Sequence, residues 1–355
     1  MVRSAGVLLC GGGTGGHVFP GLAVAADLRE RGVPTLRWIG DPERLEAKLV
    51  PAAGIPLLPI GLSRPRPRSP RWIMHALRCA FGCWREMRRR PPQAVVALGG
   101  YAALLPGLLA PLTRRPLVVL EQNAHPGRTN RLLARFASAV VVQFPEARRG
   151  LRARRILTLG NPVRELEALP RGGETTLRVL VMGGSLAARS LNDLLVNAAS
   201  DLAAIADLEI IHLAGDDDRD RVAAAYAEAG LKAEVIGFCN DMPALYRRVD
   251  LAISRAGATS VAECCAAGLG ALYVPLPWAA EDHQTANARA VARVGGAVVL
   301  PQGEVTSAGL ARVVARLARE RGLVRQLGER ARRLAHPQAA RDVGAAVQGL
   351  CRRRA

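Results

Sequence analysis

The amino-acid sequence predicts an α/β protein with two doubly wound parallel sheets, one in each of two domains. Short apolar runs alternate with glycine-rich turns and amphipathic helical segments, which is the pattern of parallel strands covered by helices on both faces. The pattern also occurs twice, because it begins again after Asn161-Pro162. A chain of 355 residues is long for a single core, so a division into two domains is expected.

The first series of strands begins at Val7–Cys10, which is apolar and leads into a glycine loop at residues 11–16. The helix predicted after this loop has Pro20 near its start and Gly32 just beyond its end, the favoured positions for these residues. The further strands expected in this half are Leu36–Ile39, Ala94–Leu98, Leu117–Leu120 and Ala139–Val142.

The second series begins at Arg178–Met182, which is followed by Gly183-Gly184 and by a helix from about Arg189. Its other predicted strands are Leu208–Leu213, Ala233–Ile236, Leu251–Ser254 and Ala271–Val274. The predicted domains are therefore residues 1–163 and residues 164–338, with a cleft between them. A final helix at 339–355 could cross back to the first domain.

The segment 62–90 departs from this alternation because it combines prolines, arginines and aromatic residues. Its prolines keep the first part extended, and residues 72–87 then have a helical pattern. Ile73, Leu77, Phe81 and Trp84 recur at roughly helical spacing among the arginines. One interpretation is a helix that packs on the core and has a solvated basic face. The other is an interfacial helix that places its apolar side chains among anionic lipid headgroups.

The composition points to an anionic partner, because the formal net charge is +19 and the pI is about 11.1. Nucleic acid, anionic lipid and a phosphorylated substrate all satisfy this. Only Lys48 and Lys232 are lysines, so part of the excess reflects an arginine-rich composition. Aromatic residues make up only 4% of the chain, which argues against a protein that binds single-stranded nucleic acid by stacking.

The seven cysteines have no metal-ligand spacing, and their odd number argues against a disulfide framework, so we expect a reducing compartment. The sequence begins without the pattern of a signal peptide. It also lacks an uninterrupted apolar stretch of about 20 residues. We therefore expect a cytosolic protein or one on the membrane surface.

The first glycine loop permits two functions. Gly11, Gly13 and Gly16 have the spacing of a dinucleotide fingerprint, and Asp41 follows the second strand, where it could hold a ribose. This would make the protein a nicotinamide-dependent oxidoreductase. More generally, such a loop lets the backbone approach a diphosphate or a sugar at the N-terminus of a helix.

Further loops of the same type favour a different enzyme class. They are Gly99-Gly100-Tyr101, Gly183-Gly184-Ser185 and Arg255–Ala258, and each follows the carboxyl end of a predicted strand. Ligands of parallel sheets bind at these ends. Glycine loops in both domains suit an enzyme with two substrates, one of them a phosphorylated donor.

Several motifs, in order along the chain, resemble those of the UDP-N-acetylglucosamine:undecaprenyl-diphospho-muramylpentapeptide N-acetylglucosaminyltransferase (MurG) family. They are GGGTGGHVFPGLAVA (11–25), GGY (99–101), EQNAHPGRTNR (121–131), GNPVR (160–164), GGSLAAR (183–189), FCNDM (238–242), SRAGATSVAE (254–263) and DHQTANA (282–288). The resemblance implies two Rossmann-like domains in the GT-B architecture. It also implies inversion at the anomeric carbon, with no cofactor and no essential metal.

The resemblance also assigns site residues. The contacts to UDP-N-acetylglucosamine fall on Thr14, Gly15, Gly16, Asn123, Arg164, Ser185, Ala258, Thr259, Ser260, Val261, Ala262, Glu263 and Gln284, with the uracil near Phe238-Cys239. Glu263 would accept the ribose hydroxyls, Ser185 and Arg164 would hold the diphosphate, and Gln284 would bond sugar hydroxyls.

His17 is the candidate catalytic base. The attacking 4-hydroxyl of the muramyl sugar must lose a proton, and histidine is the usual side chain for this work near neutral pH. The alternative is that His17 only orients a ligand or caps the helix. Six positions depart from the family pattern: Ala102, Ala103, Leu120, Leu186, Ala187 and His283. A partial change in donor preference is the alternative that these departures leave open.

The resemblance implies a function in peptidoglycan synthesis, with undecaprenyl-linked muramyl-pentapeptide as acceptor and lipid II as product. Such an enzyme would be peripheral, on an anionic cytoplasmic membrane face, without nucleic acid and with a possible place in a cell-wall complex. This favours the interfacial interpretation of the segment with Trp72, Ile73, Leu77, Phe81 and Trp84. A UDP-sugar 2-epimerase of the same fold is the main alternative, ahead of the oxidoreductase.

Overall fold

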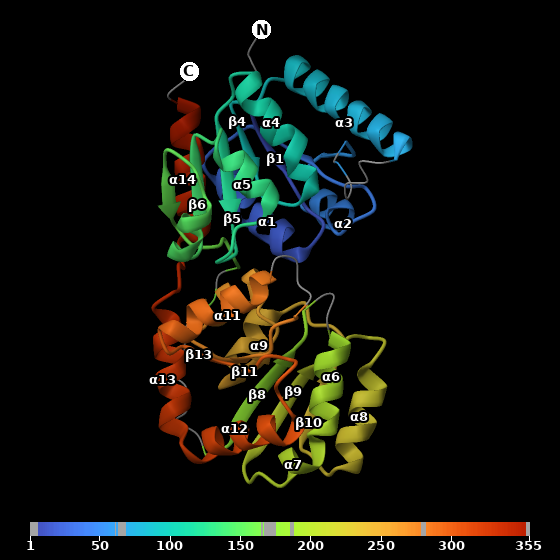
Figure 1. The fold of residues 1–355 in the computed structure, drawn as a ribbon, viewed down its shortest axis with the longest axis vertical. Coiled ribbons are helices and arrows are strands. Elements are labelled where there is room, and N and C mark those ends of the chain that lie inside the picture. Colours follow the sequence, from blue (N-terminus) through green and yellow to red (C-terminus); the bar gives the residue numbers. More distant parts are fainter. Residues whose placement is uncertain are drawn as a thin grey trace. The chain divides into compact units, whose positions relative to one another are not determined.

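Two compact units make up the protein in the computed structural model (Figure 1). Unit 1 comprises residues 1–164 and 338–355, and unit 2 comprises residues 165–337. The structure describes residues 6–60, 62, 69–164, 166, 175–184, 188–277 and 282–352. Each unit has its own sheet and its own hydrophobic core, so each is described by itself.

Unit 1 is built on a seven-stranded sheet in the order β3-β2-β1-β4-β5-β6-β7, and all neighbouring strands are parallel. The strands are β1 (Gly6–Cys10), β2 (Thr35–Ile39), β3 (Leu57–Leu58), β4 (Ala94–Ala97), β5 (Leu117–Glu121), β6 (Ala139–Val142) and β7 (Ile156–Thr158). The central strands are buried on both faces, which explains why they are continuous runs of apolar residues.

The helices of unit 1 cover the two faces of this sheet. They are α1 (Gly15–Glu30), α2 (Glu46–Ala52), α3 (Pro70–Arg89), α4 (Leu104–Leu112), α5 (Arg128–Ala134) and α14 (Ala339–Arg352), with short 3₁₀ helices at Tyr101–Ala103 and Pro145–Gly150. Within the described residues, no helix is both long enough and apolar enough to cross a bilayer.

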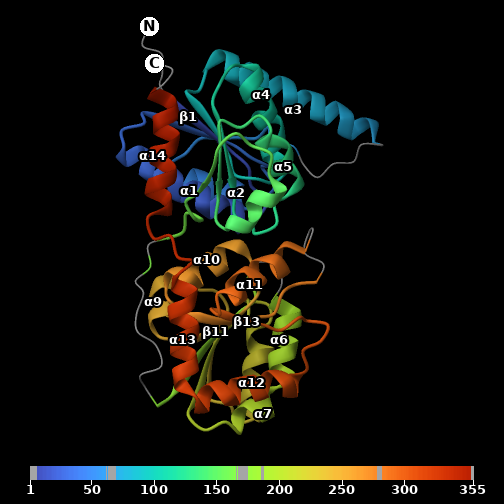
Figure 2. The same ribbon diagram turned by 60° about the vertical axis from the view of Figure 1, so that its left-hand side comes forward.

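The last helix, α14, belongs to unit 1 although unit 2 precedes it in the chain (Figure 2). Val343, Val347 and Cys351 lie in the same core cluster as residues of β1 and α1. The backbone of α14 approaches α1 closely, because a Cβ at Gly344 would lie 1.7 Å from Asp27 Oδ2. The core on this face of the sheet therefore includes residues from both ends of the chain.

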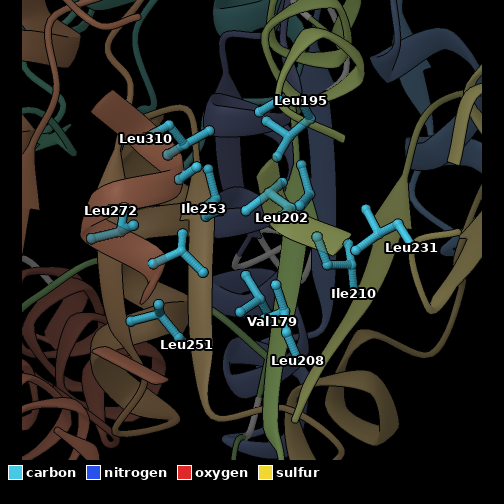
Figure 3. Packing of buried hydrophobic residues seen from close by; sticks show 14 of the residues in the cluster. Val179, Leu195, Leu202, Leu208, Ile210, Leu231, Leu251, Ile253, Leu272 and Leu310 are labelled. Carbon is cyan, nitrogen blue, oxygen red and sulfur yellow. The ribbon is translucent and has the colours of Figure 1, made fainter. Parts of the chain in front are cut away.

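Unit 2 contains a six-stranded parallel sheet in the order β10-β9-β8-β11-β12-β13. The strands are β8 (Leu177–Met182), β9 (Leu208–Leu213), β10 (Ala233–Ile236), β11 (Leu251–Ser254), β12 (Gly270–Tyr273) and β13 (Ala297–Val299). The helices are α6 (Ala188–Asn197), α7 (Ala199–Ala203), α8 (Arg219–Glu228), α9 (Met242–Arg247), α10 (Ala258–Ala266), α11 (His283–Arg293), α12 (Ser307–Arg319) and α13 (Arg321–Arg332). Figure 3 shows its core, in which Val179, Ile253 and Leu272 from the sheet lie close to Leu202 and Leu310 from the helices.

The predicted fold class is confirmed, and the differences concern short elements. Three strands were not predicted: β3, β7 and β13. Each has two or three residues, lies at the edge of its sheet and is largely half-buried, so no apolar run marks it. The predicted loop at 11–16 is shorter than expected, since α1 already begins at Gly15.

Candidate active site

The order of the strands identifies a place for a site in each sheet, at the carboxyl ends of its central strands. In unit 1 the order reverses between β1 and β4, and in unit 2 it reverses between β8 and β11. Ligands of open parallel sheets bind at such switch points, beyond the carboxyl ends of the strands. The glycine loops at 11–14 and 99–100 follow β1 and β4, and the loops at 183 and 255–257 follow β8 and β11.

The loop between β1 and α1 is held by hydrogen bonds from three directions. Gly11 N–H donates to Ile39 O at 3.1 Å, and the indole Nε1 of Trp38 donates to Gly11 O at 2.8 Å. The N–H of Gly13 donates to Oε2 of Glu46 at 2.8 Å. The loop is therefore fixed to β2 and α2, and it carries Thr14 at the N-cap position of α1.

His17 lies in the first turn of α1, and its ring is half-buried. Its Nδ1 is 3.0 Å from the carbonyl oxygen of Gly12 and 3.3 Å from Oγ1 of Thr14. A carbonyl oxygen only accepts hydrogen bonds, so Nδ1 carries the proton and the neutral ring has its lone pair on Nε2. This tautomer is the one in which Nε2 can take up a proton.

The loop after β4 is close to the same ring. A Cβ at Gly99 would lie 2.9 Å from Nε2 of His17, and one at Gly100 would lie 2.7 Å from the oxygen of Gly12. Both glycines have positive φ, 103° and 75°. Glycine is thus required here for its backbone conformation and because the two loops touch. Tyr101 follows them and is exposed.

A buried carboxylate organises the loop after β5. Glu121 is 2% exposed, and its oxygens accept hydrogen bonds from Asn123 N, Asn123 Nδ2, Gly127 N and Asn130 Nδ2 at 2.9–3.1 Å. Burial raises the pKa of Glu121, and these hydrogen bonds oppose the rise. Asn130 Nδ2 and His17 Nε2 both lie within 3.5 Å of the Cβ position of Gly99, so this network lies beside the loop that approaches His17.

Arg164 ends the first of the two chain segments of unit 1 and contacts Phe19 of α1. Its guanidinium carbon is 5.7 Å from the ring centroid of Phe19, a cation–π distance. Thr14, Gly15, Gly16 and His17 lie at the start of the same helix. The structure thus brings these predicted residues together at one end of α1.

In unit 2, the motif SRAGATSVAE runs from the last residue of β11 through the following loop into α10. Glu263 is 6% exposed, and its Oε2 accepts a hydrogen bond from Tyr246 Oη at 3.0 Å. Near the N-terminus of the helix, Thr259 Oγ1 is buried and has no hydrogen-bond partner within the described residues. A buried hydroxyl at a helix N-terminus suits an oxygen-rich ligand. Ala258, Ser260, Val261 and Ala262 lie in the same helix.

The neighbouring loops are fixed by buried side chains. Gln284 Oε1 accepts from Leu276 N at 3.0 Å, so the amide nitrogen of Gln284 is the end that can donate to a ligand. Asn287 Nδ2 donates to Ala256 O at 3.0 Å, and Arg255 Nη1 donates to Val274 O at 2.8 Å. Burial lowers the pKa of Arg255 to about 10. These contacts hold the loop that leads into α10.

The structure gives no contact geometry for two of the predicted donor-binding residues, Ser185 and Cys239. Ser185 lies outside the described residues, as do Leu186 and Ala187. Cys239 is half-buried and follows Phe238, whose side chain is 71% exposed. The uracil contact at this position stays a prediction.

Three contributing residues were not predicted: Glu46, Asn130 and Tyr246. Asn130 lies within the quoted motif EQNAHPGRTNR, so its position in a family motif was an available signal. Glu46 and Tyr246 lie outside every quoted motif, in short helices with no distinctive spacing. Their contacts to the loop at 11–14 and to Glu263 depend on the tertiary fold.

A buried histidine supports the start of α6. His212 is 0% exposed, with Nε2 3.0 Å from Asn192 Oδ1 and Nδ1 2.7 Å from the hydroxyl of Tyr226. Asn192 Nδ2 donates to Asp218 Oδ2 at 2.7 Å, so its Oδ1 must accept from Nε2–H. The neutral form is therefore matched to its neighbours, and burial lowers the pKa of His212 to about 4 from 6.5.

This gives a prediction for stability against pH. Below about pH 6.5 the unfolded chain binds a proton on His212 that the folded chain excludes. Above this pH the neutral His212 makes its full contribution to the free energy of unfolding. This contribution is lost as the pH falls toward about 4, at up to about 1.4 kcal/mol per pH unit. Denaturant unfolding at several pH values should show this slope, and His212→Gln should reduce it. An equal slope in both proteins would contradict the assignment.

Helix α3 has one face in the core and one face exposed. Cys79, Cys83 and Met87 are buried, whereas the exposed large side chains are Ile73, Met74, Leu77, Phe81 and Trp84. Phe81 is 60% exposed. Trp72, which was predicted among the interfacial side chains, is half-buried. Arg88 lies 5.5 Å from the centroid of the Trp84 ring, so the exposed face combines aromatic and cationic groups.

Comparison with known proteins gives consistent similarities over nearly the whole chain. Residues 7–142 match the glycosyltransferase family 28 N-terminal domain, and residues 178–341 match the glycosyltransferase family 28 C-terminal domain. The chain is 42% identical over 346 residues to the UDP-N-acetylglucosamine–N-acetylmuramyl-(pentapeptide) pyrophosphoryl-undecaprenol N-acetylglucosamine transferase of Aeromonas hydrophila, covering 95% of this chain and 94% of the relative. It is also 42% identical to the protein of that name from Bordetella petrii, covering 98% of each chain.

Solved structures give the same result. The crystal structure of Acinetobacter baumannii MurG has a TM-score of 0.82 and 34% identity, covering 97% of this chain and 99% of that one. A putative UDP-N-acetylglucosamine 2-epimerase from Listeria monocytogenes has a TM-score of 0.69 but only 13% identity, so it shares the fold alone.

Proposed function

The chain belongs to the MurG family of glycosyltransferases, and from this we infer that it transfers N-acetylglucosamine from UDP-N-acetylglucosamine to undecaprenyl-linked muramyl-pentapeptide. The product is lipid II, and the reaction is a step of peptidoglycan synthesis. The observation that carries this conclusion is 42% identity, over 95% or more of the chain, to transferases with that name. The names of these relatives support the transferase prediction and not the epimerase or oxidoreductase alternatives.

His17 supplies the base for this reaction. The 4-hydroxyl oxygen of the muramyl sugar forms a bond to the anomeric carbon, and the bond from that carbon to UDP breaks with inversion. The hydroxyl proton passes to Nε2 of His17. The contact of Nδ1 with the carbonyl of Gly12 supports this role, because it leaves the lone pair on Nε2.

Residues of unit 2 hold the donor. Glu263 accepts hydrogen bonds from the ribose hydroxyls, the start of α10 with Thr259 binds oxygens of the donor, and Gln284 donates to sugar hydroxyls. The buried environment of Glu263 supports the first role, since a carboxylate there must be hydrogen-bonded. The charge on the departing UDP is stabilised by oriented amides, Ser185 and Arg164.

A transfer assay tests the function directly. The purified chain is incubated with radiolabelled UDP-N-acetylglucosamine and a short-chain analogue of the lipid-linked muramyl pentapeptide. Label in the lipid fraction is the expected result. Conversion of the donor into its 2-epimer without transfer would favour the epimerase instead. Neither transfer nor epimerisation would contradict both functions.

The acceptor is lipid-linked, so the enzyme works as a peripheral protein on the cytoplasmic face of the membrane. The exposed face of α3 is the contact with anionic lipid, since it combines Leu77, Phe81 and Trp84 with arginines such as Arg88. The charge of +19 favours the same surface.

Replacing Leu77 and Phe81 together by serine is expected to reduce binding to anionic vesicles by more than about tenfold, because each buried apolar side chain contributes about 1.5–3 kcal/mol. Vesicle sedimentation measures the bound fraction. Phe136→Ser is a matched control, since Phe136 is exposed in unit 1 but lies outside α3. Equal binding of the α3 variant and the control would exclude α3 as the contact.

A further inference from the structure

Glu46 is a fully buried carboxylate that α2 places against the first glycine loop. Its side chain is 0% exposed. Oε2 accepts the N–H of Gly13 at 2.8 Å, and Oε1 accepts the N–H of Asp41 at 3.1 Å. Burying a carboxylate is costly unless it is hydrogen-bonded, and here backbone N–H groups provide the bonds. An apolar side chain would fill the same space without this cost, so the carboxylate indicates a role for its hydrogen bonds.

The backbone on two sides of Glu46 is shaped to receive it. A Cβ at Gly12 would lie 2.0 Å from Oε1 of Glu46, and a Cβ at Gly40 would lie 2.8 Å from its Cγ. Any other residue at these positions would collide with the side chain. The glycines at 12 and 40 therefore leave room for this carboxylate, so that Glu46 packs directly against the backbone of the loop.

One peptide group connects Glu46 to His17. The C=O of Gly12 and the N–H of Gly13 belong to the same planar peptide unit and point in opposite directions. Glu46 binds the N–H side of this unit, and Nδ1 of His17 donates to the C=O side at 3.0 Å. Any rotation of the peptide plane would break both bonds together.

We propose that Glu46 is a positioning residue for His17. By holding the Gly12–Gly13 peptide plane, it keeps the Gly12 carbonyl directed at Nδ1, so that the proton stays on Nδ1 and the lone pair stays on Nε2. The catalytic consequence rests on the proposed function of His17 as base. The effect of Glu46 on the tautomer does not depend on that function.

The chemistry requires a carboxylate and not merely a polar side chain. The two N–H groups are bound by different oxygens of Glu46, so both of its terminal atoms must accept. Glutamine has the same shape but only one accepting atom. In Glu46→Gln, an NH₂ group must face either Gly13 N–H or Asp41 N–H, and the peptide plane loses one of its supports.

A double-mutant cycle and a tautomer measurement test the proposal. The cycle compares kcat of the wild type, Glu46→Gln, His17→Ala and the double variant. When His17 is present, Glu46→Gln should lower kcat about 10- to 100-fold, which is the effect of a small misplacement of a catalytic group. In the His17→Ala background it should change kcat by less than about threefold, because residues that act as a unit are not additive.

The ¹⁵N chemical shifts of the His17 ring measure the tautomer independently of activity. The wild type should show a protonated Nδ1, and Glu46→Gln should show a mixture of the two tautomers. Glu43→Gln is the matched control, because it removes the same charge from an exposed residue just before α2 and should change neither measurement. Circular dichroism checks folding, and Glu46→Asp replaces the glutamine variant in every arm if that variant is unfolded.

Each outcome decides the proposal. A loss of the same size in both backgrounds, or an unchanged tautomer in Glu46→Gln, would overturn it and leave Glu46 with a structural role only. If His17→Ala itself has the kcat of the wild type, the base assignment fails. The ¹⁵N shifts then still decide whether Glu46 sets the tautomer.

Discussion

Replacing His17 by alanine should lower kcat for transfer by about 10²- to 10⁴-fold, the usual contribution of a general base. The KM for UDP-N-acetylglucosamine should change far less, because the base acts on the acceptor hydroxyl only in the transition state. Steady-state transfer to a water-soluble acceptor analogue measures both constants. The expectation follows from the Nδ1–H tautomer that the Gly12 carbonyl imposes.

His75→Ala is the control for this variant, because His75 is exposed on α3 and its loss should leave transfer to the soluble acceptor intact. A His17→Ala enzyme with an unchanged kcat and a raised KM would show that His17 only orients a ligand. An unchanged kcat and an unchanged KM would mean that His17 has no role beyond the helix start.

Replacing Glu263 by alanine should raise the KM for UDP-N-acetylglucosamine by about 100-fold. Hydrogen bonds to a charged group contribute about 1.5–3 kcal/mol, and the ribose hydroxyls would lose this partner. Calorimetric titration with UDP measures the same loss without any acceptor. The alanine variant also leaves the buried Tyr246 hydroxyl without its bond to Glu263, so a lower melting temperature is expected as well.

Glu263→Gln separates these two effects. Its amide oxygen can still accept from Tyr246, so stability should be retained while affinity for UDP falls. Glu228→Ala controls for charge, because Glu228 is exposed at the end of α8. Wild-type affinity in both Glu263 variants would remove Glu263 from the donor site.

The central part of the fold could be predicted because buried parallel strands must be apolar along their whole length. This holds for β1 and β4, and for β8 and β11 apart from Arg178 and Ser254; the carboxyl ends of these four strands carry the glycine loops. The edge strands β3, β7 and β13 are short, and their half-buried residues leave no such signal. Length and burial therefore decide which strands can be recognised in a sequence.

The site residues divide in a similar way. His17, Asn123, Arg164, Glu263 and Gln284 could be named because they lie in motifs that resemble those of a family. Glu46 could not be named, since its role depends on one peptide plane reached across the fold. The sequence identifies groups that face a ligand better than groups that hold such groups in place.

The position of α14 has a consequence for how the chain is made. Unit 2 is one continuous segment, whereas the core of unit 1 needs Val343, Val347 and Cys351, which come after unit 2. During synthesis on the ribosome, unit 2 can therefore fold before unit 1 is complete. Until α14 is made, the apolar residues of unit 1 that pack against it stay exposed on the nascent chain, where chaperones can bind them. A chain that ends before α14 would be open to proteolysis at the same residues.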